Sequence, residues 1–363
     1  MTSKPVKTIG ILGGGQLGRM LALAAAELGL TCHIYCPEAD AIAAQVAAKT
    51  TVAPYDDKQA LAAFADAVDI VTYEFENVPA QTAAILGAHA PVRPSAHALK
   101  VAQDRLTEKT FLRETGVATA PFAAVDNAAD LESALQTIGS PAVLKTRTLG
   151  YDGKGQVKIT VPAEAEDALR AIAHAPAILE GFIPFEREIS VIAARGTDGT
   201  TRIYDTGENS HKDHILDETR VPARISAELN SQAQAIAGKI ITALDYVGVL
   251  GVELFVLPPE AGAARLLVNE IAPRVHNSGH WTQDACTVSQ FEQHIRAVAG
   301  WPLGDPARHA DALMKNLIGE EIRTVQETAG AEGTAVHIYG KQDPRPGRKM
   351  GHITRLSPLS RPG

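Results

Sequence analysis

Apolar runs and amphipathic stretches alternate along the first hundred residues. Lys7 to Leu12 is a short apolar run, an Ala- and Leu-rich segment follows it and ends at Gly29, and Thr31 to Tyr35 is the next apolar run. Strand and helix signals continue to alternate to about Pro94. This alternation is typical of βαβ units, so it predicts a parallel sheet in the first part of the chain.

The pattern changes after residue 103. Residues 104–116 predict a charged amphipathic helix, with Gly116 past its end as a C-cap. A smaller α/β unit follows, with predicted helices over 128–138 and 163–173 and strands over 142–145 and 157–160. A long helix with one apolar face is predicted over 225–244, and short strands are predicted over 337–339 and 352–354.

Two later segments, Val247 to Val256 and Arg265 to Gly279, each begin as a run of β-branched and apolar residues. Between them lie residues 257–264, which are rich in Pro, Ala and Gly, so the pattern predicts a β-hairpin. Each arm carries one acid in its apolar run, Glu253 and Glu270. If the turn is centred in the intervening segment, these acids lie opposite each other, with Cβ atoms about 5 Å apart.

Opposed carboxylates repel each other, and a half-buried carboxylate is costly unless it is paired or bound to a cation. Two converging acids therefore fit Mg²⁺, which proteins hold with one or two carboxylates and substrate phosphates. Alternatively, one acid pairs with Lys or Arg, or the register of the hairpin differs. The hairpin pattern alone leaves both interpretations open.

The first apolar run is followed by Gly13, Gly15 and Gly18, which match the pattern G-x-G-x-x-G. A dinucleotide site would also need an acid at the end of the second strand, and here that strand runs into Cys36 and Pro37. We therefore expect no NAD site. The glycines either let the backbone approach an anion at a helix N-terminus or allow tight packing of helix on strand.

A second glycine-rich segment contains Gly150, Gly153, Lys154 and Gly155 between two predicted strands. Backbone N–H groups and a lysine suit a flap over phosphates, although a plain hairpin turn has the same composition. The segment lacks the G-K-[ST] ending of a P-loop. Lys145 ends the preceding apolar strand, where a lysine needs an anion.

Polar residues also gather at other predicted strand ends. Glu76 and Asn77 follow the strand over 69–72 and face a ligand crevice or, for Asn77, cap the next helix. Residues 272–281 are polar, irregular and aromatic directly after Glu270, which favours an anion and substrate site. A basic loop that is either a phosphate site or a solubilising surface contains Lys341, Arg345, Arg348 and Lys349.

Composition narrows the class of protein. The net charge of −8 argues against a nucleic-acid or anionic-membrane surface, and no apolar run approaches the length of a membrane span. The N-terminus lacks the apolar core of a signal peptide. The three cysteines indicate neither a disulfide framework nor a zinc site. A cytoplasmic enzyme is the class that these features favour.

With the hairpin acids, the glycine-rich flap and the linker Glu180 to Ile183 together, the chain resembles the ATP-grasp enzymes. More narrowly, it resembles the 5-(carboxyamino)imidazole ribonucleotide synthetase family, the ATP-dependent carboxylating enzymes of bacterial purine biosynthesis. The likeness extends through nearly the whole chain, in the segments GGGQLGRM, YEFENVP, DRLTEK, GYDGKGQ, EREISVI, NEIAPRVHNSGHWT and RPGRKMGH. The last two segments are specific to this family within the superfamily.

The resemblance implies a three-domain α/β fold. It comprises an N-terminal Rossmann-like pre-ATP-grasp domain over residues 1–103, an ATP-grasp domain over 104–298 with a small lobe over about 117–183, and a small β-rich domain over 299–363. It also implies a homodimer through the central domain.

The resemblance also assigns residues to sites. Phosphates of ATP would contact Arg105, Lys145 and the flap Gly150, Tyr151, Asp152, Gly153, Lys154, Gly155 and Gln156. Adenine would lie against Glu180, Gly181, Phe182 and Ile183, with Glu188 at the ribose and His211 nearby. Mg²⁺ would bind Glu253 and Glu270, assisted by Asn269. Strict alternation puts Asn269 on the opposite face from Glu270, so a twist or bulge is needed there.

For the imidazole ribonucleotide, the resemblance implies contacts with Gln16, Leu17, Glu76, Asn77, Tyr151, Asp152 and Arg274, with the phosphate on Lys341, Arg348 and Lys349. The implied catalytic residues are Arg274, His276, Tyr151 and Asn277. Arg274 suits bicarbonate or phosphate through its forked donors. His276 is the candidate to orient the intermediate or accept the proton of the amine, because an imidazole pKa ordinarily lies near working pH.

The chemistry implied for the family begins with attack of bicarbonate on the γ-phosphate of ATP, which gives carboxyphosphate and ADP. Carboxyphosphate then yields carbon dioxide or reacts directly, and the exocyclic amine of aminoimidazole ribonucleotide becomes a carbamate. Competing interpretations are another ATP-grasp ligase or carboxylase acting on a phosphorylated amine, a dehydrogenase and a non-catalytic ATP-binding regulator. The polar cluster after Glu270 argues against the regulator.

Overall fold

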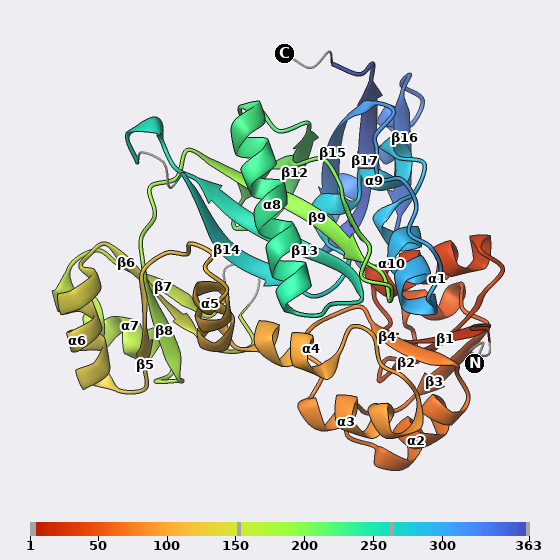
Figure 1. Ribbon diagram of the computed structural model, residues 1–363, viewed down its shortest axis with the longest axis horizontal. Helices are drawn as coiled ribbons and strands as arrows, with labels where there is room; N and C mark the ends of the chain where they lie inside the picture. Colours follow the sequence, from red (N-terminus) through yellow and green to blue (C-terminus); the bar gives the residue numbers. More distant parts are fainter. Residues whose placement is uncertain (1–4, 151–153, 262–264, 361–363) are drawn as a thin grey trace.

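The structure is a computed structural model, which describes residues 5–150, 154–261 and 265–360. Within these ranges the strands form three sheets, of four, nine and four strands. Figure 1 shows the N-terminal sheet and the small lobe on either side of α4 and α5, with the central sheet above them. In the described part of the chain, every helix is too short or too polar to span a bilayer.

The N-terminal sheet is parallel, as the alternation of strands and helices predicts. Its strand order is β3-β2-β1-β4. Ile9, Ile11 and Ile34 on the inner strands are completely buried, as expected for a parallel sheet that is covered on both faces. The elements of this region are β1 Thr8–Leu12, α1 Gln16–Glu27, β2 Thr31–Cys36, η1 Ile42–Gln45, β3 Lys49–Val52, α2 Lys58–Asp66, β4 Ile70–Tyr73, α3 Ala80–His89 and α4 Ala96–Gln103.

A four-stranded antiparallel sheet with the order β5-β8-β6-β7 makes up the small lobe. Leu131 and Leu135 of one helix pack with Leu144 and Leu179 of the sheet to form its core. The charged helix α5 connects this lobe with the rest of the molecule. The elements are α5 Arg105–Glu114, β5 Phe122–Val125, α6 Ala128–Ile138, β6 Ala142–Thr146, β7 Gln156–Ile159, η2 Pro162–Glu164, α7 Ala165–Ala171 and β8 Ala177–Gly181.

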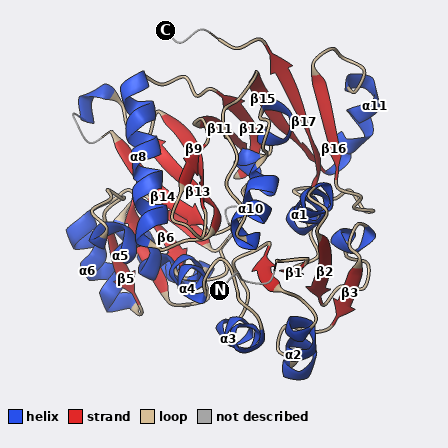
Figure 2. Cartoon of the chain, turned by 45° about the vertical axis from the view of Figure 1, so that its right-hand side comes forward, coloured by secondary structure: helices blue, strands red, loops and turns tan. Residues whose placement is uncertain are grey.

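The central sheet has the order β14-β13-β9-β11-β12-β15-β17-β16, with β10 paired to β9. The C-terminal strands therefore extend this sheet, as Figure 2 shows. Its strands are β9 Arg187–Arg195, β10 Thr201–Ile203, β11 Gly207–Lys212, β12 Ile215–Val221, β13 Gly248–Val256, β14 Leu266–Ala272, β15 Asp311–Ile318, β16 Thr334–Ile338 and β17 Lys349–Ser357.

Two helices fix the central sheet to its surroundings. Helix α8, Ala227–Ala243, packs its apolar face on β9 and β13. Helix α10, Gln290–Ala299, lies between this sheet and the N-terminal domain, where His294 Nε2 is 2.8 Å from Thr72 Oγ1 and Nδ1 accepts the N–H of Val249. The remaining short helices are η3 Pro259–Ala261, η4 Asn277–Gly279, α9 Thr282–Ala285, η5 Gly319–Thr324 and α11 Val325–Thr328.

Candidate active site

The predicted hairpin is present, and its two acids face each other. β13 and β14 pair antiparallel, with Glu253 directly opposite Glu270. The register shifts between Glu253 and Leu254, so that Leu254 pairs with Val268 and Asn269 is the extra residue of a β-bulge. A twist or bulge was needed for Asn269 and Glu270 to serve the same site, and the bulge is present. It interrupts the strict alternation of side chains at Asn269.

The opposed acids are electrostatically strained in the way the sequence predicted. Burial, and next the neighbouring Glu270 carboxylate, raise the pKa of Glu253 to about 8. Glu270 has a cationic contact, because Arg105 Nη1 lies 3.3 Å from it, whereas Glu253 is 3.3 Å from Nε2 of the His276 ring. The alternative left open by the sequence, in which one acid pairs with arginine, therefore holds for Glu270. The two carboxylates nevertheless lie opposite each other.

A buried charge cluster links the small lobe to this hairpin. Glu180 on β8 forms ion pairs with Lys145 at 3.2 Å and with Lys109 at 3.4 Å. Burial raises the pKa of Glu180, but the two lysines outweigh it and lower the pKa to about 2. The prediction that Lys145 needs an anion is therefore confirmed, with the Glu180 carboxylate as that anion in the ligand-free protein.

Lys109, which the sequence analysis did not single out, is completely buried on α5. Its Nζ also donates to the carbonyl of Asn269 at 2.6 Å, on the bulge of β14. It therefore joins the strand that carries Glu270 to the strand that carries Glu180. The sequence signal was weak, because a lysine in a charged amphipathic helix ordinarily faces solvent.

The glycine-rich segment of the small lobe connects β6 and β7 as predicted. Arg105 donates to the carbonyl of Gly150 at 3.4 Å, so the start of the flap lies beside the hairpin acids. Gly155 has a φ of +70°, and a Cβ there would be 2.6 Å from Thr146 Oγ1. Tyr151, Asp152 and Gly153 lie outside the described residues.

Glu188 and His211 contact each other between β9 and β11, beside a register shift at Ser210 and His211. Burial lowers the pKa of His211, but the Glu188 carboxylate raises it above its ordinary value. Each residue is therefore the polar partner of the other. Their side chains remain about one-quarter exposed, at 25% for Glu188 and 28% for His211, so a ligand can reach them.

Arg274 and Glu76 form a forked ion pair between the loop after β14 and the end of β4. Arg274 donates through Nε to one carboxylate oxygen of Glu76 and through Nη2 to the other, the latter at 3.1 Å. The pair joins residues 198 positions apart, so two residues assigned to one substrate lie together. Asn77 is exposed, and Pro79 rather than Asn77 occupies the N-cap of α3.

His276 lies beside Glu253. The expectation that its pKa lies near working pH is wrong for the ligand-free protein. Burial, and next the nearby Arg274, lower the pKa of His276 to about 3. Its Nδ1 is 2.8 Å from Ser278 Oγ. The adjacent Asn277 has both side-chain polar atoms buried and, among the described residues, without a hydrogen-bond partner. Because such atoms are costly to bury unpaired, they favour a ligand at this loop.

The first glycine-rich turn surrounds an acid of the same chain. Glu74, at the end of β4, accepts the N–H groups of Gly15 and, at 2.5 Å, Gly18. A Cβ on Gly13 would lie 2.3 Å from the side chain of Glu74, and one on Gly15 would lie 2.7 Å from it. The glycines therefore do let backbone approach an anion, and that anion is Glu74. In the sequence, the one indication of this role is that Glu74 lies two residues before Glu76.

Gln16 and Leu17 open α1 directly after this turn, and the basic loop approaches the same region. Lys341 Nζ donates to the carbonyl of Lys349 at 2.8 Å, and Arg348 Nη1 donates to the carbonyl of Asp343 at 2.9 Å. Burial and the neighbouring Arg348 lower the pKa of Lys341 to about 8, while Glu74 opposes that shift. Arg345 pairs with Asp343 in an exposed ion pair, which fits a surface residue.

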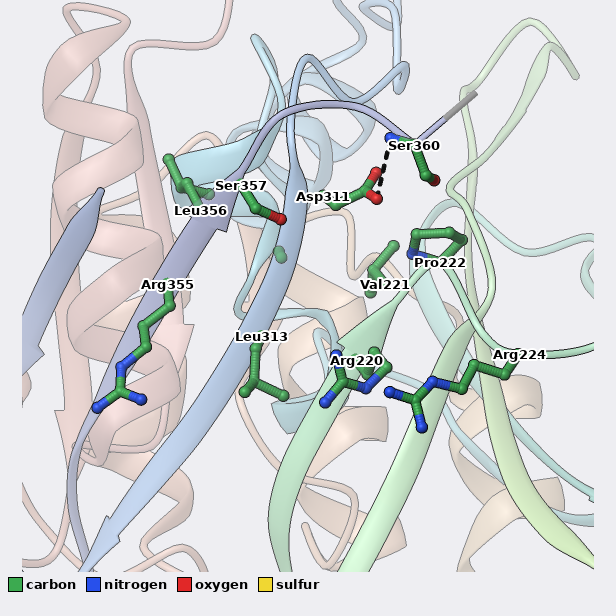
Figure 3. Close-up of a pocket in the computed structure, with 11 residues that line it drawn as sticks. Arg220, Val221, Pro222, Arg224, Asp311, Leu313, Arg355, Leu356, Ser357 and Ser360 are labelled. Atoms are coloured by element: carbon green, nitrogen blue, oxygen red, sulfur yellow. Dashed lines mark hydrogen bonds between the residues drawn. The ribbon is translucent and has the colours of Figure 1, made fainter. Parts of the chain in front are cut away.

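A cavity of about 360 Å³ lies at the other end of β12 and β17, away from these residues. Figure 3 shows Arg220, Arg224 and Arg355 around it, with Asp311 accepting the N–H of Ser360 at its rim. None of the predicted site residues lines it. The candidate active site is therefore the region between the hairpin acids, the Arg274 loop and the N-terminal sheet.

Comparison with known families assigns this architecture to a class. Residues 110–291 match the model of the ATP-grasp domain, residues 6–103 match the ribonucleotide synthetase preATP-grasp domain, and residues 312–359 match the phosphoribosylaminoimidazole carboxylase C-terminal domain. The fold and the opposed acids thus define an ATP-grasp enzyme, an ATP-dependent ligase. The predicted fold class is confirmed.

Individual relatives narrow the class to one family. The N5-carboxyaminoimidazole ribonucleotide synthase of Brucella melitensis biotype 1 is 54% identical over 98% of both chains. A crystal structure of the ADP complex of an N5-carboxyaminoimidazole ribonucleotide synthetase superposes with a TM-score of 0.93 at 42% identity, covering 98% of this chain and 94% of that one. A synthase from Aspergillus clavatus in complex with ADP and 5-aminoimidazole ribonucleotide has a TM-score of 0.90 at 30% identity, with 98% and 94% covered.

The chain belongs to the N5-carboxyaminoimidazole ribonucleotide synthetase family. The resemblance identified from the sequence motifs is therefore confirmed.

Proposed function

We propose that this protein uses ATP and bicarbonate to carboxylate the exocyclic amine of 5-aminoimidazole ribonucleotide in purine biosynthesis. The observation that carries the proposal is one constellation of residues: Glu253 and Glu270 lie opposite each other, Arg274 lies near both acids, and the Asn277 side chain has no hydrogen-bond partner among the described residues. A cation site and a forked guanidinium can neutralise charge during phosphoryl transfer to bicarbonate, and the amide of Asn277 can donate to the same anion.

Mg²⁺ fits the opposed acids, because a divalent ion removes the repulsion that raises the pKa of Glu253. Glu253 and Glu270 would hold it, with the bulge at Asn269 bringing a third oxygen ligand within reach. Bound there, Mg²⁺ would neutralise charge on the transferring phosphate.

The nucleotide would lie between the small lobe and the central sheet. Arg105 and Lys145 would contact its phosphates, and both stand beside acids that keep them positioned before ATP binds. Adenine would lie against residues 180–183, with Glu188 at the ribose and His211 behind it. The flap, residues 150–156, would close over the phosphates and exclude water from the fragile carboxyphosphate.

The ribonucleotide would lie on the opposite side of the hairpin acids. Glu76 would accept a hydrogen bond from the exocyclic amine. Gln16 and Leu17 would contact the base or sugar. Lys341 and Arg348, with Lys349 in support, would hold the phosphate. Burial lowers the pKa of Lys341 to about 8. This favours a phosphate site, because a nearby anion raises that pKa and stabilises the charged lysine.

In the reaction, an oxygen of bicarbonate attacks the γ-phosphorus of ATP, and ADP leaves. The amine nitrogen then attacks the carbon of carboxyphosphate, and the carbon–oxygen bond to phosphate breaks. Arg274 stabilises the charge on carboxyphosphate through its forked donors. Because the pKa of His276 lies near 3, we assign it to orienting the intermediate, and the departing phosphate accepts the proton of the amine.

The homodimer, the cytoplasmic location and the domain limits at residues 103 and 298 belong to the same proposal. Light scattering on the purified protein tests the dimer. Limited proteolysis tests the domain limits, since cleavage is expected at exposed connections between domains.

The decisive experiment measures ADP release with bicarbonate, with and without 5-aminoimidazole ribonucleotide. We expect release to depend on both substrates and to fall at least about 100-fold in Glu270→Gln, because the variant loses a metal ligand. Glu260→Gln is the matched control, since Glu260 is exposed in the turn of the same hairpin. Equal release with an unrelated phosphorylated amine would favour another ATP-grasp ligase, and release independent of any amine would overturn the proposal.

A further inference from the structure

A cluster of metal-ligating side chains lies outside the site described above, where the C-terminal strands meet the short helix α9. Asp284 comes from α9, His337 from β16 and His352 from β17. One ring nitrogen of each imidazole and one carboxylate oxygen of Asp284 all lie within 4.8 Å of one another. The nearest contact is between His337 Nε2 and Asp284 Oδ1, at 2.9 Å.

His352 supplies a second, independent sign of a ligand. The residue is completely buried, and its Nδ1 is 2.8 Å from the hydroxyl of Tyr339. Its Nε2 is also buried but has no hydrogen-bond partner among the described residues. In the tautomer whose Nδ1–H donates to the tyrosine oxygen, Nε2 carries a lone pair that can bind a metal ion. Nε2 is the nitrogen that this tautomer offers to an ion.

The three groups suit a tetrahedral site that is completed by water. Two imidazoles and one carboxylate are a common set of protein ligands for Zn²⁺, at bond lengths of about 2.0–2.2 Å. The rings of His337 and His352 stack with centroids 4.5 Å apart and 16° between their planes. An imidazole binds a metal ion in the plane of its ring, so both nitrogens reach one ion only if one ring turns out of this stack. His337 has room to turn, since its side chain is 28% exposed.

We propose that Asp284, His337 and His352 bind one Zn²⁺ or a similar imidazole-preferring divalent ion. This site differs in kind from the opposed glutamates, because nitrogen ligands select transition metals whereas carboxylates and phosphates suit Mg²⁺.

The position of the site gives it a structural consequence. β16 and β17 are the strands that flank the loop with Lys341 and Arg348, while Asp284 follows the loop with Arg274. An ion held by all three ligands connects the strands that flank the Lys341 loop to the segment that follows the Arg274 loop. Metal binding is therefore expected to raise the melting temperature, because the ligands come from segments that separate on unfolding.

The test uses the full chain, stripped of metal by a chelator and then titrated with Co²⁺ in excess Mg²⁺, which occupies the all-oxygen site. Tetrahedral Co²⁺ with nitrogen ligands absorbs visible light more strongly than octahedral Co²⁺. We expect one equivalent to bind with a tetrahedral spectrum and to be displaced by Zn²⁺. This readout does not depend on enzymatic activity, so it can fail or succeed whatever the substrate is.

Two variants separate a metal site from an ordinary ion pair. Asp284→Asn keeps a hydrogen-bond acceptor for His337 but removes the charged ligand, and His337→Gln removes a ligand that is partly exposed. Both should bind Co²⁺ at least about tenfold more weakly. His89→Gln is the control, because His89 forms an exposed pair with Asp66 at 3.0 Å without a third ligand. Equal binding by wild type and Asp284→Asn, or an octahedral spectrum in wild type, would overturn the proposal.

Discussion

The N-terminal glycine-rich turn and the central hairpin each bury carboxylates, but they satisfy them differently. Glu74 receives N–H groups from Gly15 and Gly18, so its partners come from its own chain. Glu253 and Glu270 face each other, with Arg105 3.3 Å from Glu270 and the His276 ring 3.3 Å from Glu253. A buried acid with internal donors stabilises the local structure, whereas a pair of acids without enough donors calls for a cation.

The comparison also separates two meanings of a glycine motif. The glycines of the first turn leave room for Glu74, so the position that a pyrophosphate would take in a dinucleotide-binding protein is occupied by the protein itself. Gly150, at the start of the flap, lies next to Arg105, which also contacts Glu270. Composition alone does not distinguish these cases, because both turns are rich in glycine.

The largest effect is expected from Arg274→Ala. The variant loses the forked donors and leaves Glu76 unpaired, so ribonucleotide-dependent ADP release should fall about 100- to 1000-fold. Steady-state kinetics with coupled ADP detection measures it. Arg345→Ala is the matched control, because Arg345 pairs only at the surface. Near-normal turnover in Arg274→Ala would contradict the assigned role.

Lys109→Met tests whether the buried lysine holds the hairpin and the small lobe in register. Removing it leaves Glu180 with one lysine and the carbonyl of Asn269 without this donor, so the free energy of unfolding should fall by about 3 kcal/mol. Urea unfolding monitored by circular dichroism measures the change. Lys100→Met, on the neighbouring helix and exposed, is the control. A loss below about 0.5 kcal/mol would show that the contacts carry little energy.

Glu74→Gln should have a smaller effect, since glutamine retains one of the two acceptors. We expect a loss of about 1–3 kcal/mol in the free energy of unfolding, because one buried N–H group is left unpaired. The KM for the ribonucleotide should rise while the KM for ATP stays unchanged, because the turn carries Gln16 and Leu17. A parallel rise in both KM values would contradict this local role. Glu38→Gln, an exposed acid after β2, is the control.

The last prediction concerns pH. The pKa of Glu253 is raised to about 8 in the folded protein, so the unfolded chain releases this proton at lower pH than the folded one. Folding therefore becomes less favourable as pH rises from about 4.5 to about 8, and is unaffected by this group outside that window. Glu253→Gln should flatten that decline.

Urea unfolding at several pH values, without Mg²⁺, measures this contribution. The pKa of Glu108 is also raised to about 8, by burial, so Glu253→Gln removes only part of the decline. Added Mg²⁺ should oppose the decline in wild type and bind more tightly as pH rises toward 8, because binding displaces the proton. Identical pH curves for wild type and variant would refute the strained pair.

The sequence by itself determined the features that depend on local pattern. Alternating apolar runs specified the parallel sheet, and the spacing of Glu253 and Glu270 about one turn specified their opposition. The resemblance placed Asn269 and Glu270 at one site, and strand alternation then required a twist or a bulge there, of which the structure has the bulge. These features depend on residues that are neighbours along the chain or across one hairpin.

Only the tertiary structure decided the contacts between distant segments. The Arg274–Glu76 pair, the Glu74 carboxylate in the glycine turn and the buried Lys109 join elements that no local pattern connects. The low pKa of His276 has the same origin, because burial by surrounding segments outweighs the ordinary preference of an imidazole. Periodicity shows which face of an element is buried, but the partner that meets a polar group there depends on how the domains pack.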